Sequence, residues 1–174
     1  MESPPIPIDL PRPTVVIVMP GMAYGAGDHS SIGGELKAAH DGTARYVALG
    51  DTGLSPVFVD DLAAGIVGAL DRGRIGEAYV LAGENTRLRD AMAIAARVGG
   101  HRLPRLEIPV ALLRLGSRAP ASLARLAGLP DDLREVLAAG LGVTYWASSA
   151  KAAAELGYAP RNLASGIRAA FGDG

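Results

Sequence analysis

Adjacent carboxylates and scattered histidines are the residues of this sequence that could act as acids, bases or metal ligands. Asp60 and Asp61 are neighbours, so at the start of a helix their side chains point in different directions and do not form an acid–base pair. We expect Asp60 to cap the helix that follows, a role worth about 1 kcal/mol. His29, His40 and His101 lack the spacing of metal ligands, so we predict surface histidines and no metal site.

A glycine-rich stretch after an apolar run is the best candidate for contact with a small ligand. Residues 21–27 follow that run directly, and a backbone without large side chains at the carboxyl end of a parallel strand lets a ligand approach closely. The stretch is not a dinucleotide-binding fingerprint, because Ser30 stands where G-x-G-x-x-G requires its third glycine. Asp51, the nearest imitation of the ribose-binding acid, lies beyond the usual ~20 residues. A ligand contact and an ordinary turn both remain open, and a free-standing nucleotide-binding protein is the least favoured interpretation.

Composition and charge exclude several classes of function. The 174-residue chain contains no cysteine, so disulfides, thiolate metal sites and thiol nucleophiles are excluded. A formal net charge of -1, without a basic stripe, indicates neither nucleic acid nor a membrane surface as a partner. No apolar run reaches the roughly 20 residues of a membrane span, and no signal-peptide pattern is present. We therefore expect a soluble, cytoplasmic protein.

Short apolar runs predict strands in the first half of the chain. Residues 14–19 form a continuous run, rich in β-branched side chains, that ends at Pro20, as expected of a parallel strand covered on both faces. Residues 45–49 and 77–81 are predicted as further strands. A helix from Asp60 to Leu70 is predicted between them, with its apolar face formed by Leu62, Ile66, Val67 and Leu70.

From Gly83 onward the pattern becomes mostly helical. Between the longer predicted helices lie an extended, proline-bounded piece and several short helices rich in Leu and Ala. The predicted helices and the extended piece are residues 88–98, 105–109, 148–156 and 162–171. The order predicts an α/β fold with a proline-rich lead-in (1–13), a partial α/β unit (14–83) and a mostly helical lobe (84–174).

Four segments, in this order, resemble motifs of the extended short-chain dehydrogenases/reductases. VMPGMAYGAGD resembles the strand and YGxGD-like loop of that family, and VFVDDLA its VHVDDLA turn. GEAYVLAG is similar to its last sheet strand, and SSAKA followed by ELGYAPR to its closing element. The segments are residues 18–28, 57–63, 76–83 and 148–161. The resemblance extends from about Thr14 onward and is nearest to the NAD-dependent epimerases/dehydratases and dihydroflavonol-reductase-like members.

The resemblance implies a fold, a cofactor and a set of contacts. The chain would be the C-terminal portion of a Rossmann-like parallel sheet with a small, mostly helical substrate lobe. The family uses NAD or NADP, and the nicotinamide side of that site would be formed by Pro20, Gly21, Met22 and Ala23.

The same resemblance implies where a small-molecule substrate would bind. Tyr24, Leu54 and Tyr145 are its expected contacts. Nucleotide-sugar members often carry an arginine before the VDD strand, where it binds pyrophosphate through two parallel hydrogen bonds. Residues 51–56 contain no arginine. We therefore favour a small or apolar carbonyl or alcohol over a nucleotide sugar.

The family's catalytic and cofactor-binding signatures are missing from this chain. Its members bind the dinucleotide through a glycine fingerprint and move protons with a Tyr-x-x-x-Lys pair, in which the lysine lowers the pKa of the tyrosine. Neither Lys37 nor Lys151, the two lysines present, lies four residues after a tyrosine. We therefore predict no catalytic residue, no turnover and no cofactor binding by this chain alone.

Half of a parallel sheet would leave strand edges and apolar faces uncovered. We therefore expect a partner polypeptide that supplies the N-terminal half, or a homo-oligomer. The leading interpretation is the substrate-binding portion of an NAD(P)-dependent oxidoreductase or epimerase, as a truncated product or one part of a split enzyme. The alternative is a non-catalytic small-molecule binding or regulatory module derived from that family.

Overall fold

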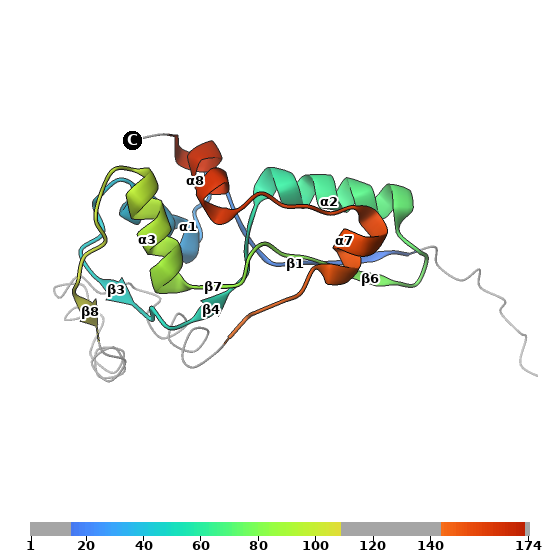
Figure 1. The fold of residues 1–174 in the computed structure, drawn as a ribbon, viewed down its shortest axis with the longest axis horizontal. Helices are drawn as coiled ribbons and strands as arrows, with labels where there is room; N and C mark the ends of the chain where they lie inside the picture. The colour runs from blue at the N-terminus through green and yellow to red at the C-terminus, as the bar shows by residue number, and fades with distance from the viewer. Residues whose placement is uncertain (1–14, 109–143, 173–174) are drawn as a thin grey trace, which may run out of the picture.

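The computed structural model describes residues 15–108 and 144–172. The predicted lead-in and the short helices expected between residues 110 and 143 lie outside the described residues. The described elements, in chain order, are β1 (Ile17–Pro20), β2 (Met22–Tyr24), α1 (Ser31–His40), β3 (Val47–Ala48), β4 (Gly53–Leu54), β5 (Pro56–Phe58), α2 (Val59–Arg72), β6 (Ala78–Leu81), β7 (Thr86–Arg87), α3 (Leu88–Val98), β8 (Glu107–Ile108), α7 (Ala150–Leu156) and α8 (Leu163–Phe171) (Figure 1).

The described strands form pairs, most of them parallel. β1 pairs with β6, β2 with β5 and β3 with β8, all in parallel, and β4 pairs antiparallel with β7. Parallel partners far apart in sequence require the helical crossovers that are seen here. The predicted α/β class is therefore confirmed.

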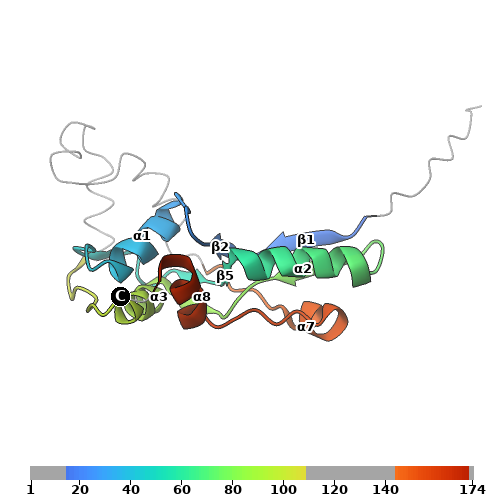
Figure 2. The ribbon, with the colours of Figure 1, turned by 90° about the horizontal axis from the view of Figure 1, so that it is seen from above.

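The elements gather around two hydrophobic clusters (Figure 2). One cluster lies where α1, α3 and α8 pack around buried Leu36, Ala95 and Ile167. The other lies where α2 and α7 cover the β1–β6 pair, around buried Tyr79 and Leu156. Helices from beyond residue 84 thus pack on both groups of elements, and the predicted boundary between unit and lobe stays a prediction.

Helix α2 begins without the side-chain cap that the sequence predicted. Its N-cap residue is Phe58, and no side chain bonds the free N–H groups there. Asp60 lies in the first turn, so the prediction that it caps this helix was wrong. An acidic residue in that turn still interacts favourably with the positive end of the helix dipole. α8 has a true cap, because Oδ1 of Asn162 accepts a 2.9 Å hydrogen bond from N of Ser165.

The aliphatic face of α2 points outward. Its buried residues are Gly65, Gly68 and Ala69, whereas the exposed fractions are 47% for Ile66 and 82% for Leu70. The glycines explain this, because a Cβ at Gly65 would lie 2.8 Å from Leu81 and from the Tyr158 ring. The helix therefore approaches the sheet through its small residues, and the predicted inward face was wrong except at partly buried Leu62.

Strand β1 is covered on one face. Val18 packs on the cluster that contains Tyr79, its partner in the parallel register. Ile17 and Met19 alternate with it and are 49% and 46% exposed. The described residues thus do not cover β1 on both faces, as the sequence had led us to expect.

None of the helices in the described residues is long and apolar enough to span a bilayer. The same residues contain no group of three or more histidine, cysteine, aspartate or glutamate side chains that could hold a metal ion.

Candidate functional site

The chain changes its strand partner at Gly21, at the carboxyl end of β1. N of Gly21 donates to O of Leu81 at 2.8 Å, and N of Met22 donates to O of Ser55 at 3.1 Å. A Cβ at Gly21 would lie 2.5 Å from that same Ser55 oxygen and 2.9 Å from Cβ of Ala82. Only glycine therefore fits where the ends of β1 and β6 meet the start of β5.

The four predicted nicotinamide contacts differ in what they can offer a ligand. Pro20 and Ala23 are exposed, whereas Gly21 and Met22 are partly buried and their N–H groups already serve the fold. The carboxyl end of a parallel strand is where such a ligand is expected to lie. Of the four, Pro20 and Ala23 are thus the residues open to a ligand. None of the four forms a diphosphate cradle, and their contact with a nicotinamide ring stays a prediction.

A polar cluster beside this strand end was not predicted from the sequence. Oγ of Ser55 donates to Oδ1 of Asn85 at 2.5 Å and accepts from N of Ala147 at 3.0 Å. Ser55 is 1% exposed, so its hydroxyl needs these partners. The cluster fastens the segment that contains Tyr145 and Ala147 to the start of β5.

The three predicted substrate contacts are not brought together. Tyr24 and Leu54 are buried, at 2% and 1% exposure, while Tyr145 is 49% exposed. The hydroxyl of Tyr24 donates to O of Leu163 at 3.5 Å, and its ring centroid lies 6.0 Å from that of Phe58. Burial, with a smaller contribution from Asp61, raises the pKa of the phenol. Tyr24 is thus a core residue in the described structure, and Tyr145 is the exposed member of the set.

One tyrosine has a lysine beside it in space, although not in sequence. Nζ of Lys151 lies 4.5 Å from the ring centroid of Tyr79 and donates to Glu77 at 2.6 Å. The hydroxyl of Tyr79 is instead held by Glu155 at 2.8 Å, and the residue is 0% exposed. The ammonium therefore contacts the face of the Tyr79 ring. The phenol oxygen is buried and bound to Glu155, so a substrate cannot reach it.

The remaining candidate acids and histidines are not gathered into one site. Asp61 binds Arg161, with 2.9 Å between Oδ1 and a guanidinium nitrogen, and Asp60 is exposed. His29 and His101 are exposed. His40 is 7% exposed and its ring centroid lies 5.5 Å from that of Phe171. The prediction of a surface histidine was therefore wrong for His40, because α1 ends against α8.

Residues 51–56 contain no arginine, but an arginine from elsewhere in the chain lies beside them. Arg87, on β7, places a guanidinium nitrogen 3.1 Å from Oδ1 of Asp51, because β7 pairs antiparallel with β4. Both side chains are more than half exposed. Sequence reasoning missed this arginine because the pairing of β4 with β7 carries no local signal.

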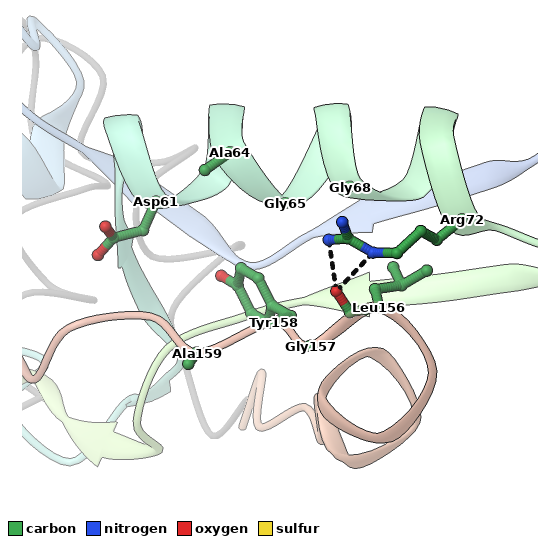
Figure 3. A pocket seen from close by; sticks show the side chains of 9 residues that line it. All are labelled: Asp61, Ala64, Gly65, Gly68, Arg72, Leu156, Gly157, Tyr158 and Ala159. Atoms are coloured by element: carbon green, nitrogen blue, oxygen red, sulfur yellow. Dashed lines mark hydrogen bonds between the residues drawn. The ribbon is translucent and has the colours of Figure 1, made fainter.

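A pocket of about 230 Å³ lies between α2 and the segment that follows α7 (Figure 3). Its residues are Asp61, Ala64, Gly65, Gly68, Arg72, Leu156, Gly157, Tyr158 and Ala159. Arg72 closes one end by donating to O of Leu156 from Nε at 3.1 Å and from its terminal nitrogen at 2.6 Å.

The hydroxyl of Tyr158 is buried in the wall of this pocket. It has no hydrogen-bond partner among the described residues, and burial, followed by the charge of Asp61, raises the pKa of Tyr158 to about 12. Arg72 already binds Leu156, and Asp61 already binds Arg161. These polar groups of the pocket therefore hold α2 to the segment around α7 and are not positioned to bind a ligand.

Comparison with known proteins gives matches to solved structures. No protein-family model and no curated protein matches the chain. The structure of gox2253 matches with 34% identity and a TM-score of 0.68, and a nucleoside-diphosphate-sugar epimerase from Pseudomonas aeruginosa with 26% and 0.64. A UDP-glucuronic acid 4-epimerase from Bacillus cereus, solved with NAD, shares the fold at 20% identity and a TM-score of 0.61.

These matches extend over nearly the whole of this chain but only part of the others. They include 89%, 90% and 90% of this chain, and 47%, 46% and 44% of the three solved chains. The chain thus spans somewhat less than half the length of the proteins it resembles. The resemblance predicted from the four motifs is confirmed: the chain matches the C-terminal portion of the NAD-dependent sugar epimerases and dehydratases of the short-chain dehydrogenase/reductase superfamily.

Proposed function

We propose that this chain is the C-terminal, substrate-binding portion of an NAD(P)-dependent oxidoreductase or epimerase-like protein, and that it performs no hydride transfer by itself. The observation that carries the proposal is the tight junction at Gly21. It places exposed Pro20 and Ala23 at the carboxyl end of a parallel strand, where ligands of open α/β sheets bind.

The proton-transfer groups support the second half of the proposal. Acid–base catalysis needs a group within about 3 Å of the reacting proton. Tyr79 is buried and bound to Glu155, and the ammonium of Lys37 is paired with Asp41. Lys151 is bound to Glu77. Tyr79, the tyrosine that has a lysine beside it, is therefore not available to act on a bound alcohol or carbonyl, and both lysines are paired with carboxylates.

The substrate class of the proposal is broader than the sequence suggested. A nucleotide-sugar substrate was disfavoured because residues 51–56 lack an arginine, yet Arg87 lies beside Asp51. A guanidinium suits a diphosphate through paired hydrogen bonds. We therefore propose a small-molecule carbonyl or alcohol substrate and include sugar nucleotides among the classes to be tested.

The test is a turnover assay of the purified chain with NAD or NADP and a panel of small alcohols and UDP-sugars. The expected result is no reduced cofactor and no epimerised sugar. The same assay, repeated with an added α/β half that carries its own glycine fingerprint and Tyr-x-x-x-Lys pair, should show turnover. Turnover by the chain alone would overturn the proposal, and so would inactivity of a stable complex of the two halves.

A further inference from the structure

Two segments of the chain run side by side at one end of the fold, beyond the ends of α1 and α3. A Cβ at Gly42 would lie 2.6 Å from the ring of His101, and N of Val47 donates to O of Leu106 at 2.9 Å. The two segments therefore advance in the same direction, residues 42–47 beside residues 101–106. Figure 1 shows the second of them running from the end of α3 to β8.

This end of the fold holds the arginines whose side chains have no partner within residues 15–108 and 144–172. The arginines elsewhere in those ranges are bound to carboxylates or to a backbone carbonyl, and they are Arg72, Arg74, Arg87, Arg89 and Arg161. Arg168 also has a partner. The side chains without one are those of Arg45, Arg97, Arg102 and Arg105, and all four residues are exposed. Arg45 and Arg105 lie 60 residues apart, so no basic run in the sequence marks this group.

The neighbouring carboxylates do not neutralise these arginines. Asp41 is already bound by Lys37, and Glu107 by Arg89. Residues 97–106 contain three arginines and no acidic residue, in a chain whose formal net charge is -1. Like charges held side by side on neighbouring strands are destabilising, so the arrangement favours an anionic partner.

The helix ends account for only part of this positive charge. Arg97 lies in the last turn of α3, where a cation interacts favourably with the negative end of the helix dipole. That interaction falls off within the last turn, so it does not extend to Arg102 and Arg105. Leu106 follows directly and is 63% exposed. The surface thus combines unpaired guanidinium groups with an exposed aliphatic side chain.

We propose that this basic surface, formed by Arg45, Arg97, Arg102, Arg105 and Leu106, binds an extended acidic segment of another protein. Carboxylates of that segment pair with the guanidinium groups, each of which can donate two parallel hydrogen bonds to a carboxylate. An aliphatic side chain of the same segment packs on Leu106 and removes it from water. The inference is independent of the proposed function, because this binding uses neither a cofactor nor a substrate.

The side chains present favour a protein segment over a nucleic acid. Proteins that bind single strands combine a basic groove with aromatic side chains on which the bases stack, and residues 97–106 contain no phenylalanine, tyrosine or tryptophan. Because this basic surface belongs to a chain whose formal net charge is -1, the remainder of the chain is net acidic and repels a long polyanion. A short acidic segment can stay within the basic surface.

Fluorescence anisotropy of a labelled short peptide of Glu-Glu-Leu repeats, titrated with the purified full chain, tests the inference. We expect saturable binding that weakens as the salt concentration rises above physiological strength, because salt screens exposed ion pairs. Replacing Arg102 and Arg105 together by glutamine should weaken the binding by about tenfold, because two ion pairs are lost. A peptide of Gln-Gln-Leu repeats should not bind.

Arg74→Gln is the matched control. Arg74 is also an exposed arginine, but it is bound to Glu155 and follows α2 at the opposite end of the fold (Figure 1). Its replacement should leave peptide binding unchanged, and circular dichroism of each variant should match that of the parent. The proposal is overturned if the acidic peptide does not bind, or if Arg74→Gln weakens its binding as much as the double variant does. Tighter binding of a single-stranded oligonucleotide, or of vesicles of anionic lipid, than of the peptide would also overturn it.

Discussion

The hydroxyl of Tyr79 donates a hydrogen bond of 2.8 Å to Oε2 of Glu155, 76 residues further along the chain. The hydroxyl oxygen of Tyr79 also accepts a hydrogen bond from N of Arg74 at 3.1 Å, and the guanidinium of Arg74 donates to the carboxylate of Glu155. These bonds hold β6 to α7. They form a polar contact at the edge of the hydrophobic cluster that contains Tyr79 and Leu156.

Replacing Tyr79 by phenylalanine should destabilise the protein. The change removes a hydrogen bond to a charged acceptor and leaves the Arg74 N–H without this partner, so we expect the free energy of unfolding to fall by about 1–3 kcal/mol. Urea unfolding followed by circular dichroism measures it. An unchanged midpoint would show that the contact between Tyr79 and Glu155 contributes nothing.

Tyr158→Phe should have the opposite sign. The Tyr158 hydroxyl is buried, and no residue in ranges 15–108 and 144–172 bonds to it, so its removal spares a desolvation penalty. We expect an unchanged or increased free energy of unfolding, with a gain of up to about 1 kcal/mol. The same unfolding experiment applies. A loss as large as that of Tyr79→Phe would mean that the hydroxyl has a partner that the structure does not show.

Gly21→Ala should destabilise the strand junction. The added Cβ would lie 2.5 Å from O of Ser55, so the end of β1 and the start of β5 must move apart, at a cost of about 1–3 kcal/mol. Gly34→Ala is the matched control on α1, where a Cβ meets nothing within 4 Å. It should stabilise the protein by up to about 1 kcal/mol. Equal thermal midpoints for the two variants would contradict the geometry at Gly21.

Glu35 should make stability depend on pH. Burial raises the pKa of Glu35 from 4.5 to about 7, and its Oε2 has no hydrogen-bond partner in the part of the chain that the structure describes. The folded state therefore holds the proton more tightly, so the stability that Glu35 contributes is fully present below pH 4.5 and is lost as the pH rises through about 7. The loss is about 3 kcal/mol.

Glu35→Gln tests that dependence, because the amide does not titrate. In this variant the free energy of unfolding, measured from pH 4 to pH 8, should lose most of its dependence on pH. The exposed control Glu84→Gln should keep the dependence seen in the parent. The account of Glu35 fails if the slope is the same in the parent and in Glu35→Gln.

Elements with a strong local pattern were predictable from the sequence. α3 spans the residues that its amphipathic spacing predicts, and β6 lies within one residue of the predicted strand. The inward face of α2 was not predictable from hydrophobicity. Gly65 and Gly68 bring the helix against Leu81 and Tyr158, and a rule that places the largest apolar residues inside selects the opposite face.

The candidate site was predictable only where it is local in sequence. The turn at Gly21 follows a strand and is marked by its own glycine, so its position was evident. The bond between Ser55 and Asn85 and the approach of Arg87 to Asp51 join residues 30 and 36 positions apart. Each depends on strand pairing, which no motif in the sequence encodes. Tyr24 was expected from the resemblance to contact a substrate, whereas in the described structure its ring packs in the core beside Phe58.

Calorimetric titration of NAD(H) and NADP(H) into the purified chain, with light scattering on the same sample, tests the central claim most directly. The account predicts no saturable heat, because residues 20–23 form no diphosphate cradle, and it predicts self-association or low stability from the free edge and exposed face of β1 in the described residues. Saturable binding of either cofactor by a monodisperse, stably folded chain would contradict it and would move the cofactor site to the glycine-rich loop at residues 21–27.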